Sequence, residues 1–306
     1  GLADHAPGGR RMTAPTGTPR PLAADLLTLT KPRIISLLLV TTVMPMYAAG
    51  SPSLASVLIV LVGGYLMAGG ANAVNMYFDR DIDDVMARTR TRPIPSGRMT
   101  PQAVISFGMA CAVAATYLLG RFINPLAAGL ALAGFYFYVF VYTRWLKRST
   151  PQNIVLGGAA GAFPPLVGWA AVTNRLDLSA ILLFLIVFYW TPPHFWALAL
   201  NKQVDYGRAG VPMAPNAWGE RETIDQIVWY SVLLVALTLL PVCIGMLGVP
   251  YLIAASGLGA WFLVGAIRVW RRRDSGDWSA PAWKLYKFSL LYLALLFLAM
   301  AVDRHL

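Results

Sequence analysis

The sequence predicts an all-α, polytopic membrane protein, a bundle of about nine transmembrane helices around a central cavity that opens to the cytoplasmic side. Hydrophobic residues make up 57% of the 306 residues and charged residues only 13%, a composition far from the average of soluble domains. The charges are concentrated in short segments between long apolar runs. Because a spanning helix needs about 20 apolar residues, this pattern is typical of a multi-pass membrane protein.

Apolar segments long enough to cross a bilayer follow one another along most of the chain. The predicted spans run over residues 34–50, 52–74, 102–120, 125–142, 153–173, 178–200, 226–248, 250–267 and 286–302. Residues 1–25 are rich in Pro, Gly, Thr and Arg and contain no apolar run that would make a signal peptide. We therefore expect a disordered, basic N-terminal tail over 1–25 and one transmembrane domain over 26–306.

The distribution of Lys and Arg predicts how these spans are oriented. With nine spans and a cytoplasmic N-terminus, 22 of the 25 basic residues lie on the cytoplasmic side, and three lie on the other side: Arg121, Arg175 and Arg304. This asymmetry is what the positive-inside rule describes. We expect a multi-pass protein of the cell (plasma) membrane, and the net charge of +11 then reflects topology and does not indicate nucleic-acid binding.

Two long connections, residues 75–101 and 201–225, lie on the predicted cytoplasmic side, whereas the connections on the other side are short. Long loops in a compact domain are usually functional. They follow the second and the sixth span, an offset of four spans that suggests two similar halves. Cys111 and Cys243 lie in apolar stretches and have no second Cys or His at a metal-ligand spacing.

The first long loop begins with three oxygen-bearing side chains, Asn75, Asp79 and Asp83. Positions i, i+4 and i+8 of a helix project from one face, so the spacing predicts a ladder of oxygen ligands. Like charges at i, i+4 destabilise a helix mildly and favour a compensating cation. Magnesium prefers oxygen and takes one or two carboxylates while a substrate phosphate completes its shell.

The second long loop repeats the spacing with Asn201 and Asp205 at the end of the sixth span. A solvated helix end paired with arginines would explain a single Asp at this depth. It does not explain two clusters in equivalent places, which together predict a diphosphate site bridged by magnesium. Basic side chains between the clusters are candidates for binding the diphosphate oxygens: Arg88, Arg92, Arg98, Lys147, Arg148 and Lys202.

Three segments of the chain resemble the intramembrane UbiA-type prenyltransferase superfamily. They are residues 75–97 (NMYFDRDIDDVMARTRTRPIPSG), 142–169 (YTRWLKRSTPQNIVLGGAAGAFPPLVGW) and 190–213 (WTPPHFWALALNKQVDYGRAGVPM). The first motif is common to the superfamily, and the other two are similar to its haem-modifying branch. The resemblance implies that Asn75, Asp79 and Asp83 bind diphosphate through magnesium and that Asp205 serves the second motif. Asn201 departs from the superfamily, which commonly has an aspartate there.

The resemblance further implies the reaction. Farnesyl diphosphate would ionise at its allylic C–O bond, and a vinyl group of haem b would capture the farnesyl cation to give haem O. The partners it implies are these two substrates, the lipid bilayer and a haem A synthase. The alternatives are a quinone-precursor or chlorophyll-type acceptor at the same metal site, or a secondary transporter. A transporter would place coupling acids in mid-span, whereas these clusters lie at helix ends.

His194 is the only histidine inside a predicted span. On a continuous helix it would share a face with Asn201 and Asp205, about 10 Å deeper. Ionisable residues inside a span are functional candidates, here for the haem acceptor, although a satisfied interhelical hydrogen bond is an equal alternative. Aromatic side chains near the site could stabilise a cation, but ordinary packing explains each of them as well: Tyr136, Tyr138, Tyr142 and Phe195.

Overall fold

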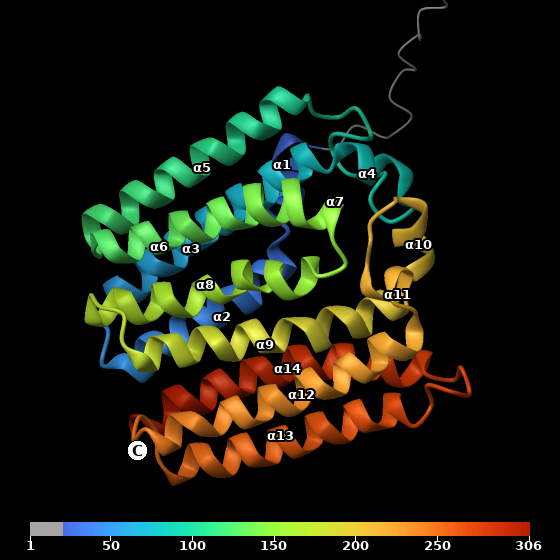
Figure 1. Ribbon diagram of the computed structural model, residues 1–306. Helices are drawn as coiled ribbons and strands as arrows, with labels where there is room; N and C mark the ends of the chain where they lie inside the picture. Colours follow the sequence, from blue (N-terminus) through green and yellow to red (C-terminus); the bar gives the residue numbers. More distant parts are fainter. Residues whose placement is uncertain (1–20) are drawn as a thin grey trace, which may run out of the picture.

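The computed structural model describes residues 21–306, and every regular element in that range is helical (Figure 1). Nine helical segments within it are long and apolar enough to cross a membrane, which confirms the predicted all-α membrane bundle. The central cavity that opens to the cytoplasmic side stays a prediction. They are α2 (Pro32–Ala49), α3 (Leu54–Phe78), α5 (Pro101–Phe122), the continuous segment Pro125–Ser149, α8 (Asn153–Thr173), α9 (Leu178–Leu200), α12 (Glu220–Cys243), α13 (Val249–Trp270) and α14 (Ser279–Asp303).

Local signals in the sequence start several of these helices. The side chains of Ser53, Thr100, Asn124 and Asp177 each accept a hydrogen bond from the backbone N–H three residues later, as N-cap residues do. Proline follows directly in two of the four cases, where its missing N–H is not needed. The helix starts are therefore encoded locally, within one turn of sequence.

The fourth span is not a uniform α-helix. It consists of α6 (Pro125–Tyr136), a π-helical stretch η1 (Phe137–Leu146) and the short α7 (Lys147–Ser149). Stretches of π-helix are rare and often occur at functional sites. The span therefore continues seven residues beyond its predicted end at 142, as far as Ser149.

Helices from the two parts of the chain pack around α2 and α8. One apolar core joins α2, α3, α5 and α6, and a larger one joins α8, α9, α12, α13 and α14. Helix α2 contacts α3, α8 and α14, and so connects the two cores. Buried side chains thus fill the space between the helices on both sides of α2.

The short helices gather at one end of the bundle (Figure 1). They are α1 (Leu22–Thr30), α4 (Arg80–Val85), α10 (Gln203–Arg208) and α11 (Ala214–Ala217). Both long loops therefore meet at the same end, as the offset of four spans predicts. The side of the membrane that this end faces stays a prediction.

The expected tail over 1–25 is too long by at least a few residues. Residues 1–20 lie outside the described part, but α1 begins at Leu22, and Asp25 within it is buried. The carboxylate of Asp25 accepts from Arg98, so this turn of helix belongs to the folded domain. With nine residues, α1 is apolar but too short to be recognised as a membrane span, which is why the sequence alone assigned its start to the tail.

Candidate diphosphate site

The first acidic cluster is buried at the junction between α3 and α4. Asn75, Asp79 and Asp83 are each no more than 4% exposed. The predicted continuous helix is interrupted at one residue, because Asp79 ends α3 and α4 starts at Arg80. The Asp83 N–H still donates to the Asp79 carbonyl oxygen at 2.7 Å, so the helical register survives the break and the three side chains stay together.

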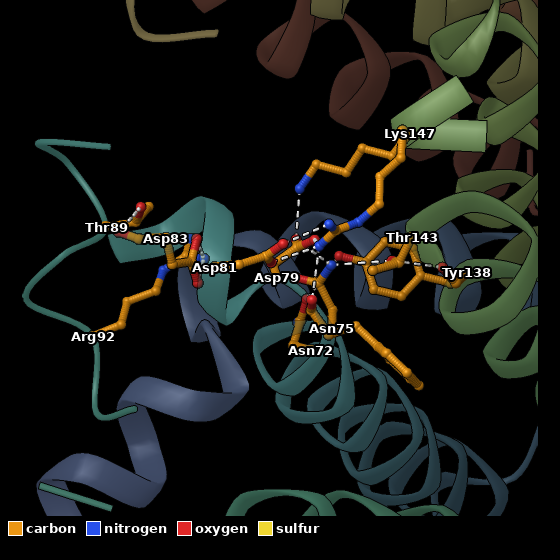
Figure 2. Close-up of polar contacts among 12 residues, drawn as sticks. Asn72, Asn75, Asp79, Asp81, Asp83, Thr89, Arg92, Tyr138, Thr143 and Lys147 are labelled. Carbon is orange, nitrogen blue, oxygen red and sulfur yellow. Dashed lines mark hydrogen bonds and ion pairs between the residues drawn. The ribbon is translucent and has the colours of Figure 1, made fainter. Parts of the chain in front are cut away.

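The two aspartates of the cluster, Asp79 and Asp83, each have a basic partner (Figure 2). Lys147 Nζ lies 2.6 Å from Asp79 Oδ2, and Arg92 Nη1 donates to both carboxylate oxygens of Asp83 at 2.8 and 2.7 Å. These contacts bring together two of the predicted basic candidates and the first motif. Buried carboxylates need such compensation, since an isolated buried charge is strongly unfavourable.

Lys31 is a member of the site that sequence reasoning treated only as a topology signal. Its Nζ donates to Asn75 Oδ1 at 2.9 Å. Lys31 has a left-handed backbone (φ 55°) between α1 and α2, directly before Pro32, where the α region is disfavoured. The pKa of Lys31 is lowered to about 7, chiefly by burial and also by the positive charges of Arg92 and Lys147, while the negative charges of Asp79 and Asp83 oppose the decrease. An additional anion in the site would favour its charged form.

Arg148, the residue after Lys147, pairs with Asp81 at the start of α4. It donates to both carboxylate oxygens of Asp81 at 2.7 Å and to the Phe78 carbonyl oxygen at 2.8 Å, while its Nη2 lies 3.8 Å from Asp79 Oδ1. The hydrogen bonds from Arg148 lower the pKa of Asp81 to about 2. Asp81 is exposed, so this pair lies at the rim of the site, and Arg148 is within reach of a ligand beside Asp79.

Arg98, a predicted diphosphate ligand, is paired with Asp25 in the structure. Its Nε donates to Asp25 Oδ1 at 3.0 Å and its Nη2 to the Thr91 carbonyl oxygen at 3.0 Å. The pair connects the start of α1 with the first long loop. No local pattern in the sequence predicts this pair, because the two partners are 73 residues apart.

We expect Arg98→Met to lower stability without affecting ligand binding. Leaving Asp25 buried without its partner should decrease the free energy of unfolding by about 1–3 kcal/mol, because Arg98 itself is partly exposed. The apparent thermal midpoint of the detergent-solubilised protein measures this, with Arg90→Met, an exposed residue of the same loop, as the control. If the variant is as stable as the wild type but binds diphosphate more weakly, the prediction is wrong and Arg98 is a diphosphate ligand.

The second cluster has a different local structure from the prediction. Helix α9 ends at Leu200, Asn201 and Lys202 form a turn, and Asp205 lies in α10. Asn201 Oδ1 accepts from Ser279 Oγ at 2.6 Å, and its Nδ2 donates to the Ala197 carbonyl oxygen at 3.2 Å. Asn201 therefore ties the end of α9 to the start of α14, which argues against its use as a metal ligand.

The two long loops nevertheless meet. A pocket of about 320 Å³ is lined by Asp81, Ile82, Val85 and Arg148 from the first half and by residues 208–211 from the second. Burial raises the pKa of Tyr206, and the positive charges of Arg88 and Arg92 oppose that rise. Arg88 and Lys202 make no ion pair within residues 21–306. They remain available to an anion.

His194 is buried and makes an interhelical hydrogen bond, which is one of the two alternatives that the sequence left open. Nδ1 lies 2.6 Å from Ser289 Oγ of α14, and the ring stacks on Trp190 and Tyr286 at centroid distances of 4.2 and 4.9 Å. The predicted common face with Asn201 and Asp205 is wrong, because the helix ends between them at Leu200. Two prolines inside α9, Pro192 and Pro193, make its geometry hard to extrapolate from spacing.

Two tyrosines of η1 lie beside the first cluster. Tyr138 and Tyr142 stack with ring centroids 5.8 Å apart, and Tyr138 Oη donates to Asn72 Oδ1 at 3.5 Å (Figure 2). Tyr136, by contrast, is 59% exposed and packs against Phe140 on the outside of the bundle. Phe195, the fourth candidate aromatic, contacts the His194 ring edge-on.

The residues of the first cluster fit a magnesium ion whose coordination shell is completed by oxygen atoms of a bound phosphate. No three His, Cys, Asp or Glu side chains of residues 21–306 form a cluster that could hold a metal without help. Asp79 Oδ1 is, however, buried with no hydrogen-bond partner, while Asp79 Oδ2 accepts from Asn75 Nδ2 and Asn75 Oδ1 accepts from Lys31 Nζ. Oxygen donors with one unpartnered carboxylate oxygen are what magnesium takes when phosphate oxygens complete its shell.

Comparisons with known proteins decide the family. The model of the UbiA prenyltransferase family matches residues 36–301, nearly the whole described chain. This chain belongs to the UbiA prenyltransferase family. The family resemblance expected from the motifs at Asn75, Tyr142 and Trp190 is thus confirmed, and the transporter alternative loses its support.

Several UbiA relatives carry the name protoheme IX farnesyltransferase. The one from Roseiflexus sp. is 56% identical over 285 residues, which cover 92% of this chain and 53% of that protein. The one from Symbiobacterium thermophilum is 51% identical over 91% of this chain and 93% of that protein. The chain spans about half the length of the first of these relatives and nearly all of the second.

Solved structures show the UbiA fold at lower identity. A digeranylgeranylglyceryl phosphate synthase superposes with a TM-score of 0.75 at 20% identity, over 92% of this chain and 98% of the other. A UbiA homologue from Archaeoglobus fulgidus bound to DMAPP and Mg²⁺ superposes with a TM-score of 0.64 at 14% identity, over 91% and 99%. At these identities the likeness concerns the arrangement of helices.

Proposed function

We propose that this chain transfers the farnesyl group of farnesyl diphosphate to a vinyl group of haem b, giving haem O and diphosphate. One observation carries the proposal: Asn75, Asp79 and Asp83 are buried together, each with a basic partner, where the two long loops meet. Relatives named protoheme IX farnesyltransferase support the acceptor. The proposed location is the plasma membrane, with this end of the bundle in the cytoplasm.

The side chains of the first cluster would hold the metal and the diphosphate together. The carboxylates of Asp79 and Asp83 and the side-chain oxygen of Asn75, Oδ1, would be the metal ligands. Asp205 of the second loop would contribute a further carboxylate. When bound, magnesium supplies positive charge that stabilises the leaving diphosphate. In the structure Arg92 and Lys147 pair with the two acids, and Lys31 donates to the Asn75 amide. These three residues would turn their N–H donors to the diphosphate oxygens, as would Arg88, Arg148 and Lys202.

The reaction needs charge stabilisation more than acid–base chemistry. The allylic C–O bond breaks with its electron pair going to the diphosphate, and the vinyl group of haem b attacks the farnesyl cation to form the new C–C bond. Water then adds to the haem-side carbon and loses a proton, which leaves a hydroxyethylfarnesyl group. Tyr138 and Tyr142, stacked beside Asp79, offer π faces that would stabilise the cation.

His194 is proposed on the haem side of the reaction. Ser289 Oγ donates its only hydrogen to the Tyr286 carbonyl oxygen at 2.7 Å, so His194 Nδ1 carries the proton in their 2.6 Å contact. The lone pair is then on Nε2, which makes no hydrogen bond within the described residues. A His194→Ala variant with an unchanged visible spectrum of bound haem b would remove the residue from this role.

The proposed activity is tested by incubating the purified protein with haem b, farnesyl diphosphate and Mg²⁺ and detecting haem O by mass spectrometry. We expect product with Mg²⁺, none with excess chelator, and recovery when Mg²⁺ is restored, since the diphosphate cannot leave without charge compensation. Replacing haem b by a quinone precursor or a chlorophyll-type acceptor is the matched comparison. Product with those acceptors and none with haem b would refute the proposal.

A haem A synthase is the proposed protein partner, because the product would be the substrate of the next enzyme. Co-purification from detergent extracts of a cell that contains both proteins tests this association. Recovery of the tagged chain without the synthase, under conditions that keep other membrane complexes intact, would contradict it.

A further inference from the structure

The amide of Asn75 has one orientation in the structure, and Thr143 takes part in setting it. Asn75 Nδ2 donates to Asp79 Oδ2 at 2.8 Å and to Thr143 Oγ1 at 3.0 Å. Its Oδ1 lies on the opposite side of the amide from Thr143 and accepts from Lys31 Nζ, one of the cations proposed to bind the diphosphate. Only Oδ1 can bind a cation, so the direction of the amide decides whether Asn75 is a ligand at all.

Thr143 can only act as an acceptor toward Asn75. Its side chain is completely buried in η1, and its hydroxyl hydrogen is donated to the Tyr138 carbonyl oxygen at 2.8 Å. A hydroxyl has one hydrogen, so only lone pairs remain for Asn75. A flipped amide would direct Oδ1 against those lone pairs and leave a buried acceptor unsatisfied, which is unfavourable.

The π-helical geometry of η1 allows the Thr143 hydroxyl to donate to its own helix while its lone pairs face Asn75. The hydroxyl of Thr143 bonds the carbonyl five residues back, at Tyr138, whereas in an α-helix threonine bonds the carbonyl three or four residues back. The same stretch leads to Lys147, which lies against Asp79. Helix η1 thus brings both an acceptor for Asn75 and a cation for Asp79 to the cluster (Figure 2).

Asp79 is the other acceptor for the amide, but its carboxylate is shared with Lys147 and would turn to a metal. Thr143 has no such second use, because it is neutral and its hydrogen is already bonded within its own helix. We propose that Thr143 is a positioning residue that holds Asn75 Oδ1 toward the metal–diphosphate complex. This role rests on the proposed function, since it presupposes that the cluster binds a divalent cation with diphosphate.

Binding of Mn²⁺, a spectroscopic substitute for Mg²⁺, tests the role without the acceptor. Electron paramagnetic resonance would measure Mn²⁺ affinity in the presence of inorganic diphosphate for the wild type, Thr143→Val and Thr143→Ser. We expect Thr143→Val, which keeps the shape and loses the hydroxyl, to weaken Mn²⁺ binding by about 10- to 100-fold, as loss of a residue that orients a metal ligand does. Thr143→Ser keeps the hydroxyl and should stay within about twofold of the wild type.

The outcomes separate this role from the proposed function. Equal Mn²⁺ affinity of the wild type and Thr143→Val overturns the positioning role while the metal–diphosphate site stands. Equal loss in Thr143→Val and Thr143→Ser also overturns it, because a packing effect explains that result. No diphosphate-dependent Mn²⁺ binding by the wild type overturns both. If Thr143→Val does not fold, Thr143→Ala gives the same comparison with less crowding.

Discussion

Replacing Asp79 by alanine is expected to reduce the rate of haem O formation by about 100- to 1,000-fold, the usual effect of removing one group that stabilises charge in a transition state. Asp79 occupies the centre of the cluster: its Oδ2 contacts Lys147 and Asn75, and its Oδ1 is the unpartnered oxygen. Alanine removes a metal ligand and releases both neighbours. The rate is measured from the initial formation of haem O at saturating substrates.

Asp84→Ala is the matched control for this experiment. Asp84 lies five residues away in α4, is exposed, and makes no ion pair within residues 21–306. It should retain the wild-type rate. Asp79→Asn separates charge from shape, because asparagine keeps the size but not the negative charge that a metal and Lys147 require. Equal rates for Asp79→Ala and Asp84→Ala would show that the first cluster takes no part in the reaction.

Replacing Gly168 by alanine is expected to decrease the free energy of unfolding by about 2–3 kcal/mol, at the upper end of the range for overpacking. A Cβ atom at Gly168 in α8 would overlap the carbonyl oxygen of Thr42 in α2. That neighbour is backbone and cannot turn away as a side chain can. The two helices would have to separate, and α2 joins the two cores, so the apparent thermal midpoint in detergent should fall clearly.

Gly161→Ala on the same helix is the matched control. A Cβ atom there would have no neighbour within 4 Å, and alanine favours a helix over glycine by up to about 1 kcal/mol. The thermal midpoint of this variant should equal or exceed that of the wild type. If both variants unfold at the wild-type midpoint, α2 and α8 do not approach each other as closely as the structure places them.

The spans and the first cluster were predictable from the sequence because their signals are local. Twenty apolar residues in a row need no partner to identify a spanning helix. The spacing of Asn75, Asp79 and Asp83 survives even the one-residue break at Asp79, because the helical hydrogen bond from the Asp83 N–H is kept. For Asn201 and Asp205 the same spacing was misleading, since a turn separates them and nothing in the spacing marks it.

The pairing of basic residues with their carboxylate and amide partners was not predictable. Lys147 meets Asp79 across 68 residues, Arg98 meets Asp25 across 73, and Lys31 meets Asn75 across 44. The distribution of Lys and Arg among the loops predicts that cations gather on one side of the membrane, but charge alone does not distinguish one arginine from another. Packing of helices distant in sequence decides which cation is buried beside which carboxylate.

By itself, then, the sequence determined the nine helices, the end of the bundle at which the long loops meet, and the oxygen ladder of the first motif. These features depend on hydrophobicity and on spacing within one helix. Only the tertiary structure placed Lys31 beside Asn75, paired Arg98 with Asp25, joined Asn201 to Ser279 and set Thr143 against Asn75. Each of these depends on contacts between helices, for which a single sequence carries no local signal.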